Sequence, residues 1–190
     1  ETQKRRYVGG IVTEDDRYLV ISGAKSTSGN DLYLKDLSKP NSPLITIIDN
    51  FDSDTDIIEN EGDKLFLVTN LAAPNKKIVT VNAKQPSPEH WQDFIAETDH
   101  VLTASVGGGY FFTEYMVDAI SKVFQYNYQG KQIREINLPG VGSASSLEGK
   151  KEDNTLYFSF TNYKTPATIY SLDVNTGASD TYRKSGAKFD

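Results

Sequence analysis

Two histidines and one serine-containing loop are the residues of this chain that could carry hydrolytic chemistry. A serine nucleophile needs the pattern Gly-x-Ser-x-Gly on a strand-to-helix turn, because the strain of that turn exposes its hydroxyl. The nearest match, GVGSAS at residues 140–145, lacks the closing glycine and precedes a predicted strand. His90 and His100 are the available imidazole bases, and the sequence shows no serine and carboxylate pattern around either. We therefore expect no catalytic residue here and a turn or solvated role for each histidine.

The acidic run at residues 49–63 could supply oxygen ligands to a metal ion. It holds seven carboxylates, and Asp52, Asp54 and Asp56 stand at alternate positions. A calcium loop that began at Asp52 would need glycine at its sixth position, where Ile57 stands. We interpret the run as a solvated acidic turn, and we expect neither a metal site nor a cofactor in this chain.

Composition and charge exclude several classes of function. The 190 residues carry 20 basic and 26 acidic side chains, a net charge of −6, so the chain should repel the phosphates of nucleic acids. No apolar run approaches the ~20 residues that are needed to cross a bilayer. The absence of cysteine excludes disulfides and thiolate metal sites, and it leaves the compartment open. We expect a soluble protein with no nucleic-acid or membrane partner, in the cytoplasm or the periplasm.

The elements that must position any functional residue are β-strands. Residues 155–174 predict a hairpin whose first strand alternates between an inward and an outward set. The inward set is Leu156, Phe158 and Phe160, and the outward set is Tyr157 and Ser159. The same hairpin pattern recurs at residues 17–37, 64–82 and 109–127. Eleven tyrosines and nine phenylalanines also favour pleated, half-buried surfaces, so the chain is predicted to be all-β.

The hairpins repeat at a nearly constant interval. Equivalent aromatic or β-branched positions of the third strand are Tyr33, Val79, Phe124 and Tyr170, which are 46, 45 and 46 residues apart. A repeat of this length with four strands is typical of a β-propeller blade. We therefore predict four four-stranded antiparallel blades at about residues 7–49, 55–97, 101–138 and 143–184. An immunoglobulin-like sandwich, the structural rival, would not repeat at this interval.

Three groups of sequence strings carry a family resemblance. They are RYVGG at 6–10 with DDRYLVIS at 15–22, IIDNF at 47–51 with NEG at 60–62, and YFSFTNY at 157–163 with PATIYSLD at 166–173. In this order and spacing they resemble blades of the propeller domain in the prolyl oligopeptidase (prolyl endopeptidase) family of serine peptidases. The resemblance spans essentially the whole chain. It implies a partial β-propeller domain over residues 1–190, made of four C-terminal blades of a seven-bladed propeller.

The resemblance also implies a function for the chain. In the family, an α/β-hydrolase domain carries a Ser, Asp and His triad and cleaves short peptides after proline, while the propeller restricts access to it. This chain would then be a substrate-gating, non-catalytic segment without peptidase activity alone. Its implied partners are the hydrolase catalytic domain, the missing blades of the same parent chain and short proline-containing peptides.

Two residues of this sequence match positions that wall the outer part of the family's substrate pocket. Val8 precedes the Gly-Gly pair as the apolar family residue does, and Thr27 falls in the loop after the second strand. Val8 is smaller than the family residue, and Thr27 differs from it in type. Ala24 stands where some members have an arginine, so the resemblance does not supply a charged contact with substrate at that position.

Other functions are compatible with the repeat. The chain could be a stand-alone β-propeller module that recruits a protein partner. It could also be a closed four-bladed ring with a metal in its axial channel, since propellers have about four to eight blades. If it is a partial arc, its two terminal blades expose apolar faces, and we expect self-association of the fragment.

Overall fold

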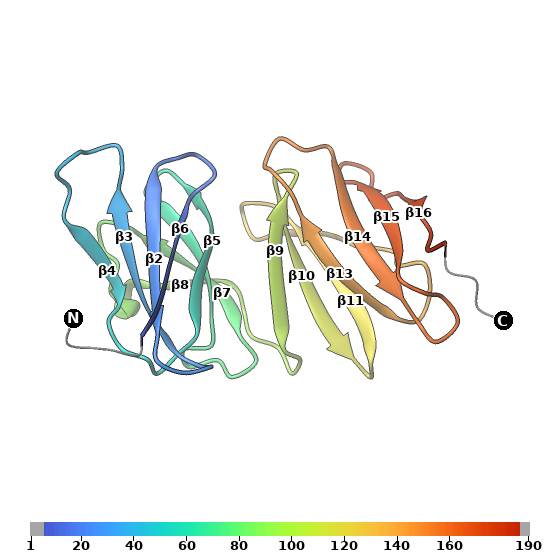
Figure 1. Cartoon of the computed structure of the whole chain (residues 1–190), viewed down its shortest axis with the longest axis horizontal. Coiled ribbons are helices and arrows are strands. Elements are labelled where there is room, and N and C mark those ends of the chain that lie inside the picture. The colour runs from blue at the N-terminus through green and yellow to red at the C-terminus, as the bar shows by residue number, and fades with distance from the viewer. Residues whose placement is uncertain (1–5, 187–190) are drawn as a thin grey trace. The chain divides into compact units, whose positions relative to one another are not determined.

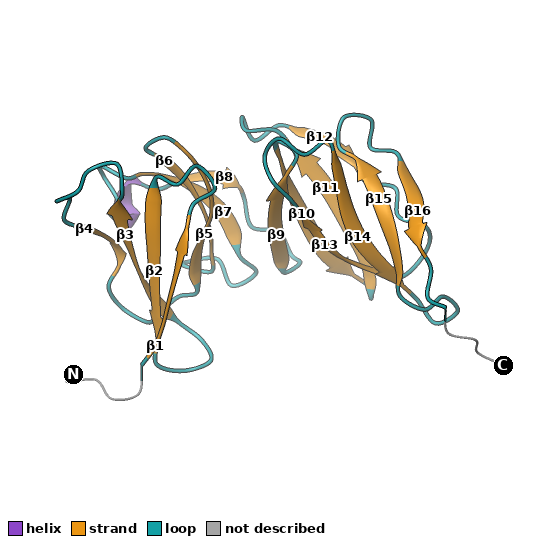
Figure 2. Ribbon diagram, turned by 45° about the horizontal axis from the view of Figure 1, so that its top comes forward, coloured by secondary structure: helices purple, strands orange, loops and turns teal. Residues whose placement is uncertain are grey.

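The structure is a computed structural model, and it describes residues 6–186. Within this range it contains sixteen β-strands and one short 3-10 helix, so the predicted all-β class is confirmed. The strands form four sheets of four strands, and neighbouring strands in each sheet are antiparallel (Figures 1 and 2). Between residues 6 and 186, no helix is long and apolar enough to cross a membrane.

The chain divides into two compact units, which meet in sequence between Asp99 and His100. The first unit holds two sheets. Its first sheet consists of β1 (Tyr7–Val12), β2 (Tyr18–Ala24), β3 (Asn30–Asp36) and β4 (Leu44–Ile48). Its second sheet consists of β5 (Thr55–Glu61), β6 (Lys64–Thr69), β7 (Lys77–Asn82) and β8 (Gln92–Ile95), with the 3-10 helix η1 (Pro88–His90) between the last two.

The second unit holds the other two sheets. The third sheet consists of β9 (Leu102–Gly107), β10 (Tyr110–Val117), β11 (Ile120–Tyr126) and β12 (Gln132–Glu135). The fourth consists of β13 (Ser143–Glu148), β14 (Thr155–Thr161), β15 (Thr168–Asp173) and β16 (Ser179–Arg183). In all four sheets the spatial order of the strands follows their order in the chain.

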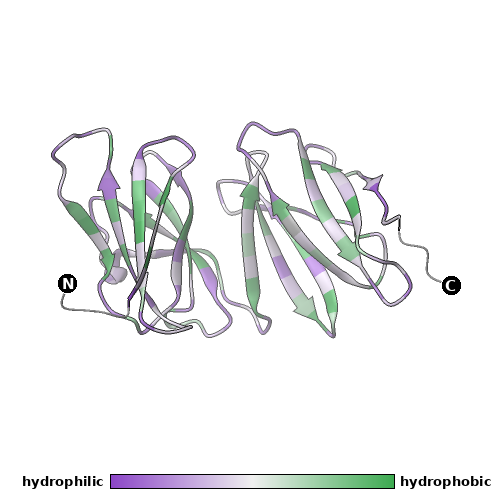
Figure 3. Cartoon of the chain, viewed as in Figure 1, coloured by the Kyte–Doolittle hydropathy of each residue, from purple (hydrophilic) through white to green (hydrophobic). Residues whose placement is uncertain are grey.

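Apolar side chains between the two sheets of each unit form its core. In the first unit, one side of the cluster comes from the first sheet and the other from the second. The cluster contains Tyr18, Val20, Leu32, Leu34, Ile47 and Ile48 from the first sheet, and Ile57, Leu65, Leu67, Val79, Val81 and Ala83 from the second sheet and its end. Figure 3 shows the corresponding concentration of hydrophobic residues along the strands. Alternate residues thus face the neighbouring sheet, as strand geometry requires.

The predicted alternation in β14 is confirmed in the core of the second unit. Leu156, Phe158 and Phe160 are almost completely buried, whereas Tyr157 is 46% exposed on the other face of the sheet. The Phe158 ring stacks on Tyr170 of β15, with 5.4 Å between the ring centroids. The sequence pattern therefore identified which face of this strand packs inward.

A one-residue irregularity recurs where the third strand of each sheet pairs with the fourth. The register shifts between Leu32 and Tyr33, Ile78 and Val79, Gln125 and Tyr126, and Ile169 and Tyr170. A bulge of this kind bends the strand and increases its twist. These shifts lie at or next to the repeating third-strand positions Tyr33, Val79, Phe124 and Tyr170. The period in the sequence therefore corresponds to a bulge at the same place in each sheet.

Asp63, in the turn between β5 and β6, joins the two sheets of the first unit by polar contacts. Its carboxylate forms ion pairs with Arg17 of the first sheet and with Lys84. It also accepts a hydrogen bond of 3.2 Å from the hydroxyl of Tyr18. The hydrogen bond from Lys84, followed by the charges of Arg17 and Lys84, holds the pKa of the Asp63 carboxyl below its ordinary value against the opposing effect of burial.

This lowered pKa predicts an acid-sensitive contribution to stability. A carboxyl whose pKa is lowered on folding stabilises the protein above the pKa of the unfolded chain, and this contribution is lost as the pH falls through the folded pKa. We therefore expect Asp63→Asn to lower the free energy of unfolding at neutral pH and to leave it nearly unchanged in acid. Urea unfolding from about pH 6 to about pH 3, followed by the fluorescence of the single tryptophan Trp91, measures the difference.

Asp52→Asn is the matched control, because Asp52 is an exposed acid in the same acidic run. It should change the unfolding free energy little at any pH in this range. A difference between wild type and Asp63→Asn that stays constant from neutral pH into acid would contradict the assigned role of the Asp63 contacts.

Candidate functional site

Val8 and Thr27, the two residues matched to the family's pocket, lie at the same end of the first sheet. In the register of β1 and β2, Tyr7 pairs with Ala24 and Val8 pairs with Gly23. The start of β1 is therefore next to the end of β2, from which the loop 25–29 with Thr27 continues. Val8 is 67% exposed and Thr27 is also exposed. Both side chains are accessible at this end, which we call the rim.

The loop that carries Thr27 is fastened to the second sheet. The side-chain amide of Asn30 makes two hydrogen bonds of 2.8 Å with the backbone of Thr55. Its nitrogen donates to the Thr55 carbonyl, and its oxygen accepts from the Thr55 N–H. The backbone N–H of Gly29 donates to the Asp54 carboxylate at 2.7 Å, and that of Asn30 donates to the Ser53 carbonyl at 3.0 Å. These four bonds, which we call the Asn30 clamp, fix the loop relative to the start of β5.

Two cations and an aromatic ring complete the rim. The ring of Phe51 lies 5.0 Å from the Arg6 guanidinium carbon and 4.1 Å from the Lys25 ammonium nitrogen. Arg6 also forms an ion pair with Asp31, which is 1% exposed. Such cation–π contacts hold positive charge in a defined place. The rim thus presents apolar, polar and cationic groups together.

These cations were not identified as site residues from the sequence. The family comparison drew attention to Ala24, which carries no charge, whereas the neighbouring Lys25 supplies an exposed ammonium at the same end of the sheet. The signal in the sequence that could have identified this cation was the position of Lys25 directly after Ala24, the residue matched to the family's arginine. Its contact with Phe51 joins residues 26 positions apart, and the strand pattern contains no information about that contact.

A cavity of about 360 Å³ is lined in part by Gly9 and Gly10, the glycine pair of β1 that follows Val8. Its lining also includes Val20 and Leu32 of the next strands, and Asp56 of β5. No atom lies within 4 Å of the place where a side chain at Gly9 would begin. Desolvation raises the pKa of the Asp56 carboxyl, against the opposing charge of Lys76. The cavity is thus largely apolar, with one carboxyl group.

The other candidate residues do not join this rim. His90 ends η1 and lines a separate cavity on the second sheet, and His100 precedes β9 in the second unit. The loop at 140–145 runs into β13 and not into a helix. Asp54 of the acidic run belongs to the Asn30 clamp and also accepts a hydrogen bond from Asn70 at 3.2 Å. Among residues 6–186, no three His, Cys, Asp or Glu side chains are grouped to hold a metal ion.

Gly29 provides a test of the Asn30 clamp. Its φ is +77°, and a β-carbon added there would lie 1.9 Å from the carbonyl oxygen of Phe51. We expect Gly29→Ala to destabilise the first unit by about 1–3 kcal/mol or more. The left-handed backbone alone costs about this much in a residue with a side chain, and the contact with Phe51 adds to it. Urea unfolding followed by Trp91, which packs against the core of this unit, measures the effect.

Gly9→Ala is the matched control in the same sheet. The space around Gly9 is open and its φ is not in the left-handed region, so the change should alter stability by no more than about 0.5 kcal/mol. Equal stability of Gly29→Ala and wild type would mean that the loop adapts without the clamp.

Comparison with known proteins agrees with this architecture. The family model described as "Prolyl oligopeptidase, N-terminal beta-propeller domain" matches residues 1–185. A prolyl endopeptidase of Elizabethkingia meningoseptica is 50% identical over 185 residues, which cover 97% of this chain and 26% of that protein. The prolyl endopeptidase of Elizabethkingia miricola is 48% identical, with the same coverage. The chain therefore spans about a quarter of the length of these relatives.

Solved structures show the same fold. A prolyl endopeptidase structure superposes with a TM-score of 0.86 and 27% sequence identity, covering 95% of this chain and 26% of that one. Prolyl oligopeptidase B from Galerina marginata, bound to a 25-residue macrocyclization substrate, also gives a TM-score of 0.86, at 24% identity over 97% of this chain and 27% of that one. The family resemblance inferred from the sequence is confirmed: this chain belongs to the prolyl oligopeptidase family, as a segment of its N-terminal β-propeller domain.

Proposed function

We propose that this chain is the substrate-gating, non-catalytic propeller segment of a prolyl oligopeptidase-like serine peptidase that cleaves short peptides after proline. The observation that carries the proposal is the 50% identity to a prolyl endopeptidase along 97% of this chain. The match covers 26% of that relative. The propeller family model matches residues 1–185 of this chain, which is nearly its whole length. In this proposal the reacting groups belong to a hydrolase domain outside these 190 residues, and the propeller selects what reaches them.

The rim is the surface through which the segment would act on substrate. Val8 and Thr27 would wall the outer part of the peptide pocket, facing the hydrolase domain. Their exposure and their common position at one end of the first sheet support this role. The Asn30 clamp would keep the wall rigid, since a binding surface selects well only when its supporting contacts are fixed. Lys25 would offer a positive charge to peptide carbonyl or carboxylate groups.

Enlarging the wall tests the gating role. In the parent chain, with the hydrolase domain attached, Val8→Trp and Thr27→Trp should narrow the pocket entrance and raise KM for a chromogenic proline-containing peptide. The turnover number should change less, because the reacting groups are untouched. Val141→Trp is the control, since Val141 is 69% exposed and belongs to the second unit, whereas the rim belongs to the first. Unchanged KM in both rim variants would contradict the assigned wall.

The isolated chain provides the complementary measurement. We expect the purified 190-residue protein to give no turnover of the same peptide. Hydrolysis that is inhibited by a serine-directed reagent would contradict the non-catalytic assignment, whatever the result for the rim variants.

We also propose that the isolated chain associates with itself. All of β1 is exposed, including Ile11 at 62%, and the fourth sheet exposes a pair of rings, Tyr157 and Tyr182, with centroids 4.8 Å apart. Apolar surfaces of this kind are typical of interaction sites. Light scattering should show a mass that rises with concentration, and Ile11→Lys with Tyr182→Lys should suppress the rise. A constant monomer mass at high concentration would favour a closed ring.

A further inference from the structure

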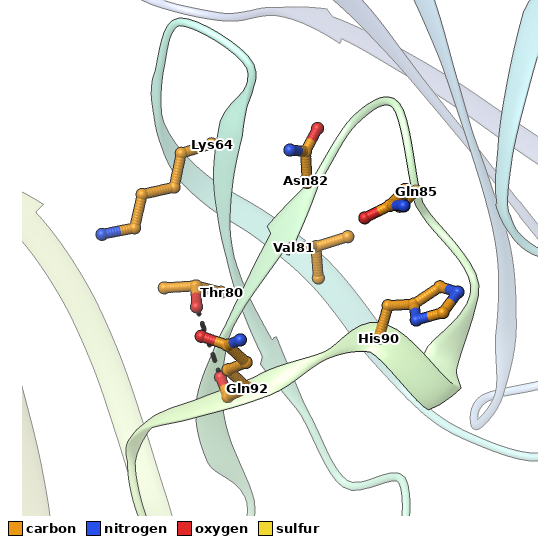
Figure 4. A pocket seen from close by; sticks show the side chains of 7 residues that line it. All are labelled: Lys64, Thr80, Val81, Asn82, Gln85, His90 and Gln92. Atoms are coloured by element: carbon orange, nitrogen blue, oxygen red, sulfur yellow. Dashed lines mark hydrogen bonds between the residues drawn. The ribbon is translucent and has the colours of Figure 1, made fainter.

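A second cavity lies on the second sheet, outside the rim. Its volume is about 350 Å³, which is at the lower end of the range of about 300–1,000 Å³ for small-molecule sites. The lining side chains used in the argument are Lys64, Thr80, Asn82, Gln85, His90 and Gln92. They come from β6, β7, the connection that includes η1, and β8, and Figure 4 shows Lys64 and His90 on opposite sides of the cavity.

The lining has no carboxylate, although the chain as a whole is acidic, with a net charge of −6. The nearest acids in sequence to Lys64 and Gln92 are already paired. Asp63 interacts with Arg17 and Lys84, and Asp93 forms a 2.7 Å ion pair with Lys77. The charged and polar groups that remain at the cavity are therefore a lysine, an imidazole and neutral side chains.

The ammonium of Lys64 is held in place by aromatic rings. It lies 4.7 Å from the centroid of Phe66 and 5.9 Å from that of Phe94, and the two rings meet edge to face at 5.0 Å. Phe66 is completely buried in the second sheet, so the ring that contacts the ammonium is itself fixed by packing. Within residues 6–186, Lys64 forms none of the ion pairs of the structure. Its charge is therefore oriented without being neutralised by a carboxylate.

The connection between β7 and β8, which borders the cavity, is fixed by its own hydrogen bonds. The indole N–H of Trp91 donates to the carbonyl of Pro86 at 2.7 Å, and the backbone N–H of Gln85 donates to the carbonyl of Asn82 at 2.8 Å. By contrast, the side-chain amides of Asn82, Gln85 and Gln92 donate no hydrogen bond to the part of the chain that the structure describes. Three amide groups and one ammonium, all on exposed residues, thus line the cavity and are accessible to a ligand from solvent.

We propose that this cavity binds a small organic oxyanion, a carboxylate or a phosphate monoester. The anionic group would sit beside the Lys64 ammonium and accept hydrogen bonds from the amide groups, and His90 would contact the other end of the molecule. Hydrogen bonds to an ionised group are about twice as strong as those between neutral groups, so this donor set favours an anion over a neutral molecule of the same shape. The site is independent of the peptidase proposal, because none of its residues belongs to the rim.

Titration of the 190-residue protein by NMR tests the site. The side-chain amide signals of Asn82, Gln85 and Gln92 are followed while succinate or glycerol 3-phosphate is added, with neutral succinamide and inorganic sulfate as comparison probes. We expect saturable shifts confined to these signals and the neighbouring backbone for at least one organic anion. The tighter of the two identifies the preferred oxyanion. Equal shifts with succinamide, equal binding of sulfate as an adventitious ion only, or no saturable shift would overturn the proposal.

Variants separate the site from general charge effects. Lys64→Gln should weaken binding by about tenfold or more, the usual size of a lost charged hydrogen bond, and His90→Gln should weaken it less. Lys131→Gln removes one exposed positive charge from the second unit and should leave the affinity unchanged. Circular dichroism confirms that each variant folds. Equal losses in Lys64→Gln and Lys131→Gln would overturn the assigned contact, since both remove the same net charge.

Discussion

Burial of apolar side chains between neighbouring four-stranded sheets is the interaction on which each unit depends. Alternation along a strand gives every sheet two faces, and one sheet alone would leave its apolar face in water. In the first unit, residues such as Leu34 and Leu67 bring two such faces together, and both are completely buried. The rim, the cavities and the turns are all supported from this layer, because their residues lie in the strands or in the short connections between them.

Apolar burial is non-directional, so polar contacts must fix how one sheet meets the next. Such contacts occur at the start of the third strand in both units. In the first, the Asn30 clamp binds Thr55 of β5. In the second, the Ser121 hydroxyl accepts a 3.0 Å hydrogen bond from the backbone N–H of Ala144 in β13. Asn30 and Ser121 are two repeats apart, so the chain uses the same place of its repeat for a cross-sheet contact with different side chains.

The sequence predicted those parts of the structure that depend on local periodicity. The alternation around Phe158 indicated the strand and its buried face, and the interval from Tyr33 to Tyr170 indicated four similar sheets. The site was predicted only through resemblance, which selected Val8 and Thr27. The clamp between Asn30 and Thr55, and the contact of Lys25 with Phe51, join residues that are 25 and 26 positions apart. Periodicity indicates which residues of a strand face inward, but it does not indicate which strand ends and loops contact one another.

The fourth strands of the sheets also limit how copies of the chain can interact. They are short, with five residues in β4 and β16 and four in β8 and β12, and the pairing of each with the third strand contains a bulge. Growth of a fibril needs a long, flat edge whose unpaired backbone groups can template another chain. These four edges are too short and too bent to serve as such templates. The bulge in the pairing of each fourth strand therefore disfavours amyloid-like growth from that edge, and the first strand of each sheet is the edge left open to pairing.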